Sequence, residues 1–184
     1  SPDTLPAAIL PRGGRGLPGL TQDSPPDIIS ARVRLWIAGL LHTHRDWDGV
    51  VCAIDGDISH WLHLSAGEAV SAQSFLTPRL MAALGGVAPP CPLALGDSLS
   101  RPERLAAHLR AAEISDRRGA LAGHLLGAEL AAARPYWLGQ QVVVAGSLAL
   151  ADLYVRALAT QGVSAQARDA IPLTLAGLCR IWAG

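Results

Sequence analysis

The stretch Gln141–Leu158 constrains the fold more than any other part of the 184-residue chain. Four apolar residues run into Gly146, and Ser147 follows at once. After Ser147, apolar residues recur at helical spacing through Leu158, so the stretch predicts a buried strand, a glycine turn and a helix with one buried face. In open α/β sheets this junction lies at the carboxyl end of a strand, where ligands bind. The helix N-terminus favours an anion or a polar ligand edge. The alternative, that the glycine only turns the chain, stays open.

Composition excludes several classes of protein. Half of the residues are apolar and 16% are charged, which excludes a disordered chain and allows one domain with a real core. The net charge is zero and basic residues form no block, so we expect no nucleic-acid partner. No apolar run reaches the roughly 18 residues of a membrane span, and the first residues do not resemble a secretory signal. The three cysteines are far apart, which fits reduced thiols in a cytoplasmic protein.

The chain contains no lysine, and all its basic side chains other than histidine are arginines. A GC-rich genome explains this bias better than function does. Any bound anion must then be held by arginine or by backbone N–H groups.

The distribution of proline, glycine and apolar residues divides the chain into two parts. Residues 1–27 form a Pro/Gly-rich segment that we expect to be irregular, and residues 28–184 form a single α/β domain. Within the first part, Gly14-x-Gly16-x-x-Gly19 matches the dinucleotide-binding pattern. It has no strand before it and no helix after it, so we interpret the match as accidental.

The apolar periodicity predicts the order β-β-β-α, further helices, then β-α-β-α. The first helix begins at Ile28, with Asp27 or Ser30 as its cap, and the capping box Ser100–Glu103 opens a later one. The predicted strands cover 49–54, 58–64, 69–75, 141–146 and 163–167, and the predicted helices cover 28–42, 77–84, 101–113, 118–133, 148–161 and 171–182. Right-handed crossovers then place parallel strands beside two hairpins, which gives a mixed sheet with helices packed on it.

This order is that of one lobe of the actin-like ATPase and sugar-kinase (ribonuclease H-like) fold. Short runs along the chain carry a closer resemblance: Leu17–Leu20 with Pro26-Asp27, Ile37–Leu40, Trp47–Cys52, Gly56 with Ser59 and Trp61, Ser65–Val70 through Phe75–Thr77, His124–Glu129, Val142–Leu150 with Tyr154, and Ala176–Leu178. They resemble the 2-dehydro-3-deoxygalactonokinase family, mainly its C-terminal lobe, and the likeness spans about residues 9–184.

The resemblance implies a cytoplasmic, bacterial enzyme whose two lobes close over ATP, Mg²⁺ and a small sugar acid. It places the adenosine end of the nucleotide on Gly146 and Ser147. It also implies a phosphate-facing hairpin made of Asp55, Gly56, Asp57 and Ser59. It assigns neither the catalytic base nor the residues that hold the sugar acid.

The sequence also departs from the family pattern, and these departures are as informative as the resemblance. The N-terminal lobe with its Asp-x-Gly-Ser/Thr hairpin is absent, and Asp27–Arg34 lacks the two acids expected there. In Asp55–Trp61 the expected histidine and lysine are Ile58 and His60, and Thr77-Pro-Arg79 replaces Thr-Gly-Glu. We therefore expect a truncated or impaired copy with little or no kinase activity. The alternative is a non-catalytic nucleotide-binding or protein-interaction module, which forms a homo-oligomer or pairs with a missing N-terminal lobe.

Other polar groups each have a functional and an ordinary interpretation. Asp55 and Asp57 could hold Mg²⁺ through water, but Asp and Gly are also usual turn residues. The arginines at 32, 34 and 79 could bind a sugar-acid carboxylate, and we favour surface or charge-compensating roles instead. His42 and His44 lie near two acids in a predicted loop, where we expect a solvated helix end and no metal.

Overall fold

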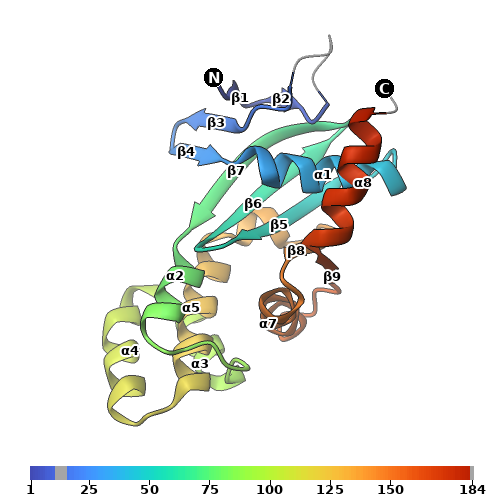
Figure 1. Cartoon of the computed structure of the whole chain (residues 1–184). Helices are drawn as coiled ribbons and strands as arrows, with labels where there is room; N and C mark the ends of the chain where they lie inside the picture. Colours follow the sequence, from blue (N-terminus) through green and yellow to red (C-terminus); the bar gives the residue numbers. More distant parts are fainter. Residues whose placement is uncertain (11–15, 183–184) are drawn as a thin grey trace.

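The computed structural model describes residues 1–10 and 16–182. Gly14 of the dinucleotide-like pattern lies outside these residues. The central feature is a six-stranded mixed sheet in the order β2-β7-β6-β5-β8-β9 (Figure 1). Its strands are β2 (Ala7–Ala8), β5 (Gly49–Asp55), β6 (Ile58–Ser65), β7 (Glu68–Phe75), β8 (Val142–Gly146) and β9 (Gln166–Asp169). The strands from β2 to β5 pair antiparallel, while β5, β8 and β9 run parallel, as the predicted order requires.

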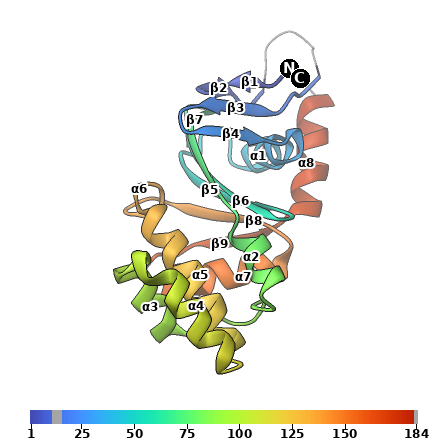
Figure 2. The ribbon, with the colours of Figure 1, turned by 90° about the vertical axis from the view of Figure 1, so that its left-hand side faces the viewer.

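Helices cover both faces of this sheet (Figure 2). One face carries α1 (Ala31–Thr43) and α8 (Ala170–Trp182). The other carries α2 (Thr77–Ala83), α5 (Arg118–Ala132), α6 (Arg134–Trp137) and α7 (Leu148–Ala159). Outside α5 lie α3 (Pro92–Ser100), the 3₁₀ turn η1 (Pro102–Arg104) and α4 (Leu105–Ile114). No helix in the described ranges is both long and apolar enough to span a bilayer.

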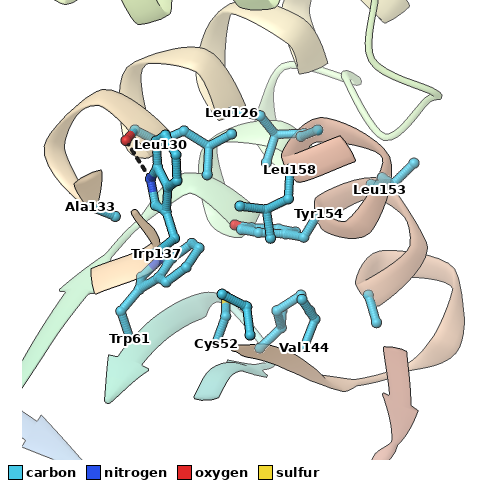
Figure 3. Close-up of a cluster of buried hydrophobic side chains, with 14 of the residues drawn as sticks. Cys52, Trp61, Leu126, Leu130, Ala133, Trp137, Val144, Leu153, Tyr154 and Leu158 are labelled. Atoms are coloured by element: carbon cyan, nitrogen blue, oxygen red, sulfur yellow. Dashed lines mark hydrogen bonds between the residues drawn. The ribbon is translucent and has the colours of Figure 1, made fainter. Parts of the chain in front are cut away.

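The alternation of side chains along the central strands builds two hydrophobic clusters, one on each face. Cys52, Trp61 and Val144 point into the cluster under α5 and α7, which Figure 3 shows. Their neighbours Val51 and Val143 point into the cluster under α1 and α8. Because β5 and β8 are buried on both sides, each reads in sequence as a near-continuous apolar run.

The N-terminal segment is not irregular, so that prediction was wrong. A second sheet, β1-β3-β4, is formed by Asp3–Thr4, Leu20–Asp23 and Pro26–Ile29, and β2 joins the main sheet. The cause is a long-range contact. The fully buried guanidinium of Arg34 donates hydrogen bonds to the carbonyls of Ala8 (2.6 Å), Ile9 (3.0 Å) and Pro18 (2.9 Å), and it pairs with Asp3 (2.7 Å).

One of the predicted helix caps forms in the structure and another does not. Ser30 caps α1, because its hydroxyl accepts a hydrogen bond from the Val33 N–H at 3.2 Å. The capping box at Ser100 does not form, because α3, which was not among the predicted helices, ends at Ser100. The Ser100 hydroxyl donates back to the Gly96 carbonyl instead of capping α4.

Candidate functional site

The carboxyl ends of the parallel strands β5, β8 and β9 meet at one edge of the sheet, where a cavity of about 430 Å³ opens. Asp55 ends β5, Ser147 follows β8 and Asp169 ends β9, and all three line this cavity. Arg32 and Trp36 of α1 form another wall. This is the position at which open α/β sheets bind ligands, and the sequence placed Ser147 and Asp55 there.

The β8–α7 junction is tightly built. Gly146 is buried, and a Cβ atom there would lie 3.1 Å from both the Cβ and the carbonyl oxygen of Ile54 on β5. A larger residue would therefore push the two strands apart. Ser147 takes an extended conformation at the N-cap of α7, but its hydroxyl makes no capping hydrogen bond. That exposed hydroxyl and the first-turn N–H groups of a twelve-residue helix can receive an anion or a polar ligand edge.

The acids of the β5–β6 hairpin are each engaged by an arginine. Asp55 is almost buried; it ion-pairs with Arg32 and accepts a hydrogen bond from the Ser30 hydroxyl at 2.6 Å. Asp57 is exposed and pairs with Arg79 at 3.2 Å. Gly56 forms the tip with a φ of +64°. The resemblance implies acids at the positions of both arginines, and each arginine here pairs with an acid of the hairpin.

Ser59 does not face this cavity, which contradicts the phosphate-facing role predicted for it. Its side chain is fully buried, and its hydroxyl donates to Glu129 Oε1 at 2.8 Å on the opposite face of the sheet from α1. Successive strand residues point to opposite faces, which separates Ser59 from the hairpin tip.

The three arginines that could bind a sugar-acid carboxylate lie in different surroundings. Arg34 is committed to the N-terminal strands and is closed to any ligand. Arg32 lines the cavity, with its guanidinium 5.9 Å from the ring centroid of Trp36. It is therefore the one of the three arginines that can contact a ligand in this cavity.

Glu129 is a central polar residue that the sequence analysis did not single out. It is buried in α5, where Oε1 accepts hydrogen bonds from Ser59 and from the Trp61 indole (2.8 Å each), and Oε2 accepts one from the Tyr154 hydroxyl (3.0 Å). Burial raises the pKa of the Glu129 carboxyl, and the hydrogen bonds it accepts oppose that rise. An acid on the apolar stripe of α5, next to Leu125 and Leu126, is the signal that could have revealed it.

Asp169 was also missed. It is the last residue of β9, and its Oδ1 accepts a hydrogen bond from the Ile171 N–H at 2.9 Å, at the start of α8. An acid directly between a parallel strand and a helix is the sequence signal for such a position.

The histidines near residue 42 do not gather into a metal site. His42 is the penultimate residue of α1 and His44 follows the helix, while the His60 ring hydrogen-bonds to Ser74. Over the ranges 1–10 and 16–182, no three His, Cys, Asp or Glu side chains converge as ligands.

These features define a fold. The mixed sheet with helices on both faces is that of one lobe of the actin-like ATPase and sugar-kinase fold. The structure is similar to that of a Sinorhizobium meliloti protein assigned as a 2-dehydro-3-deoxygalactonokinase, with a TM-score of 0.82 and 24% identity over 98% of this chain and 72% of that one. It is also similar to component A of the (R)-2-hydroxyglutaryl-CoA dehydratase of Acidaminococcus fermentans, with a TM-score of 0.50 and 12% identity over 80% of this chain and 65% of that one.

The C-terminal half carries a similarity to one particular family. Residues 100–181 match the model of the family described as 2-keto-3-deoxy-galactonokinase. The resemblance to this kinase family that the sequence predicted is thus confirmed. The matched segment includes Glu129, Gly146, Ser147 and Asp169. A comparison with curated proteins finds no match.

Proposed function

We propose that this chain is the nucleotide-binding lobe of a sugar-acid kinase of the 2-dehydro-3-deoxygalactonokinase type, with impaired chemistry. The observation that carries the proposal is the convergence of three parallel strand ends on the cavity at Ser147. The volume of about 430 Å³ lies within the usual range for small-molecule sites. In intact relatives the corresponding reaction would transfer a phosphoryl group from ATP to a hydroxyl of 2-dehydro-3-deoxygalactonate in the cytoplasm.

The residues present fit a nucleotide. Gly146 and Ser147 would lie at its adenosine end, and the hairpin residues Asp55 to Asp57 would lie toward its phosphates. Arg32 is a positive group on the phosphate side, and the first-turn N–H groups of α7, directly after Ser147, would donate to polar atoms at the adenosine end. The carboxylate of Asp169 is the type of ligand that Mg²⁺ accepts together with phosphate oxygens, and Mg²⁺ would neutralise charge in the transfer.

The impairment rests on the two ion pairs of the hairpin. Arg32 pairs with the nearly buried Asp55, and Arg79 pairs with the exposed Asp57, so a metal ion at either carboxylate would have to displace an arginine. Phosphoryl transfer depends almost entirely on positioning and on charge neutralisation, and a reversed charge pattern at the phosphates opposes both. We therefore expect nucleotide binding without robust turnover.

Calorimetry with ATP, ADP and Mg²⁺ tests the binding, and Ser147→Tyr fills the cavity. We expect this variant to weaken nucleotide binding at least tenfold, which is about 1.4 kcal/mol. Ser115→Tyr, at the exposed C-terminal end of α4, is the matched control and should bind as the wild type does. Equal binding by both variants would place the nucleotide elsewhere.

A coupled assay with ATP and 2-dehydro-3-deoxygalactonate tests the impairment. Robust turnover by the 184-residue chain would contradict it. If no nucleotide binds at all, the second candidate is favoured: a non-catalytic interaction module that forms a homo-oligomer or pairs with another lobe. The outer face of α8 favours that candidate, because Ile171, Leu175, Leu178 and Trp182 are all more than half exposed there.

A further inference from the structure

A second cavity, of about 480 Å³, lies at the opposite edge of the sheet, and the proposed kinase function makes no use of it. We name it the amino-end cavity, because it opens beside the first residues of β8 and β9. Its walls include the C-terminal end of α1, the loop before β5, the residues before β8, and β9 itself. The five residues of β8 separate it from the cavity at Ser147 by roughly 16 Å, at about 3.3 Å per strand residue. The two cavities share no lining residue within the described ranges.

One wall is an aromatic surface fixed in place. The Trp47 indole N–H donates to Gln141 Oε1 at 3.1 Å. A Cβ at Gly49 would lie 2.7 Å from Cζ2 of the same ring, so the glycine lets the indole pack directly against the backbone. Trp137, also in the lining, is buried in the cluster on the other face of the sheet, where its indole donates to the Leu130 carbonyl at 2.8 Å, so Trp47 is the ring on which a ligand can stack. Flat apolar groups held in this way lose little conformational entropy when a ligand stacks on them.

The polar groups favour an anion. Arg168 is the cation of the lining; its guanidinium donates to Gln166 Oε1 at 2.6 Å and to the Ala167 carbonyl at 3.2 Å. The strand register pairs Gln166 with Val143 and Arg168 with Ala145, so both side chains lie on the α1 side of the sheet. Among the described residues of the lining there is no aspartate or glutamate, and His44 is the other ionisable side chain.

Amide and hydroxyl groups complete the rim. Gln140, Gln141 and Gln166 line the cavity together with Ser164, and each can both donate and accept hydrogen bonds. A ligand with several hydroxyl groups matches such donors and acceptors. An apolar face on the ligand would match Trp47.

We propose that the amino-end cavity binds a small hydroxylated carboxylate, of the sugar-acid class. Its carboxylate pairs with the Arg168 guanidinium, which is suited to bidentate contact with such a group. Its hydroxyls hydrogen-bond to the glutamine amides, and its C–H face stacks on Trp47. The site is distinct from the nucleotide cavity and does not depend on the kinase proposal.

The test is a titration followed by calorimetry and by tryptophan fluorescence, with gluconate as the probe. Glucose has comparable hydroxyls without the carboxylate, while acetate and inorganic phosphate are anions without the polyol. We expect saturable binding of gluconate and at least tenfold weaker binding of the other three. Arg168→Gln should weaken gluconate binding at least tenfold, and Trp47→Leu should weaken it as well. The control Arg117→Gln, at the exposed start of α5, should bind gluconate as the wild type does.

Three results would overturn the proposal. Undiminished gluconate binding by Arg168→Gln would remove the carboxylate contact, and equal binding of phosphate or acetate would remove the sugar-acid class. Loss of gluconate binding in Ser147→Tyr, with retention in Arg168→Gln, would place the ligand in the other cavity. Circular dichroism of each variant confirms that the fold is intact. Nucleotide binding, measured separately, reports on the kinase proposal alone.

Discussion

At the scale of single residues, Glu129 is a buried side chain that accepts hydrogen bonds from three buried donors, Ser59, Trp61 and Tyr154. Its carboxylate receives hydrogen bonds from β6 and α7 while it sits on α5, so it ties together three elements on one face of the sheet. A buried donor without a partner costs about 1–3 kcal/mol, so the loss of this acceptor is felt at several donors together. A substitution of Glu129 should therefore destabilise the fold far more than its position in an Ala- and Leu-rich helix suggests.

Replacing Glu129 with leucine keeps much of the volume but removes every acceptor. Trp61 and Tyr154 would each retain a buried donor without a partner, and the Ser59 hydroxyl would keep only the Phe75 carbonyl at 3.5 Å, so we expect the free energy of unfolding to fall by at least about 3 kcal/mol. Urea unfolding measures this change. The control is Glu113→Leu on the exposed side of α4, where a change within about 0.5 kcal/mol is expected. Equal effects of the two substitutions would contradict the central role of Glu129.

The pKa of Glu129 gives a prediction with a defined sign. Burial raises the pKa of the folded carboxyl above the ordinary 4.5, so the unfolded chain releases this proton first as the pH rises. The contribution of Glu129 to stability is therefore complete below pH 4.5 and is lost as the pH rises through the folded pKa. Urea titration at several pH values gives the unfolding free energies of the wild type and of Glu129→Gln. As the pH rises over this range, the wild type should lose stability relative to the variant. A constant difference would show that the pKa is not raised.

At the scale of elements, glycines set how closely the helices approach. A Cβ at Gly39 of α1 would lie 2.0 Å from the Leu173 carbonyl oxygen of α8, and a Cβ at Gly177 would lie 2.3 Å from the Leu35 carbonyl oxygen. Both contacts are with backbone, which cannot move aside as the end of a flexible side chain can. The α1–α8 pair is therefore specified by two glycines that face each other's helix.

Two alanine substitutions in helices test this packing. Gly39→Ala must push α8 away, and we expect it to destabilise the protein by about 1–3 kcal/mol through overpacking. Gly96→Ala in α3 is the matched control, since nothing lies within 4 Å of its Cβ position, and it should stabilise the helix by about 0.5–1 kcal/mol. Thermal or urea unfolding of both variants gives the comparison. The packing argument fails if Gly39→Ala is as stable as Gly96→Ala.

The elements also show what sequence patterns can predict. The strand–glycine–helix junction at Gly146 and the hairpin at Gly56 have strong local signals, and the structure has both. The topological rule for parallel strands then brought Ser147 and Asp55 to one cavity. The N-terminal strands were not predictable in this way, because they depend on Arg34, which is remote in sequence. The burial of Ser59 likewise depends on Glu129, seventy residues away.

At the scale of the whole molecule, one sheet serves two hydrophobic clusters. Val51 and Cys52 are neighbours on β5, yet they belong to clusters on opposite faces, and Val143 and Val144 on β8 repeat the arrangement. If β5 and β8 unfold, the hydrophobic clusters on both faces of the sheet become exposed to solvent. The chain should therefore unfold as one unit despite having helices on two sides.

Hydrogen exchange followed by mass spectrometry along a urea series tests this unity. Amides in α1, on one face, and in α7, on the other, should open with the same free energy, because both clusters share β5 and β8. The helix α4 is the internal comparison, since Ala112 is its one buried residue, and it should open at a lower free energy. A difference of more than about 1 kcal/mol between α1 and α7, well above usual experimental error, would divide the faces into separate cooperative units. That result would contradict a single domain over residues 28–184.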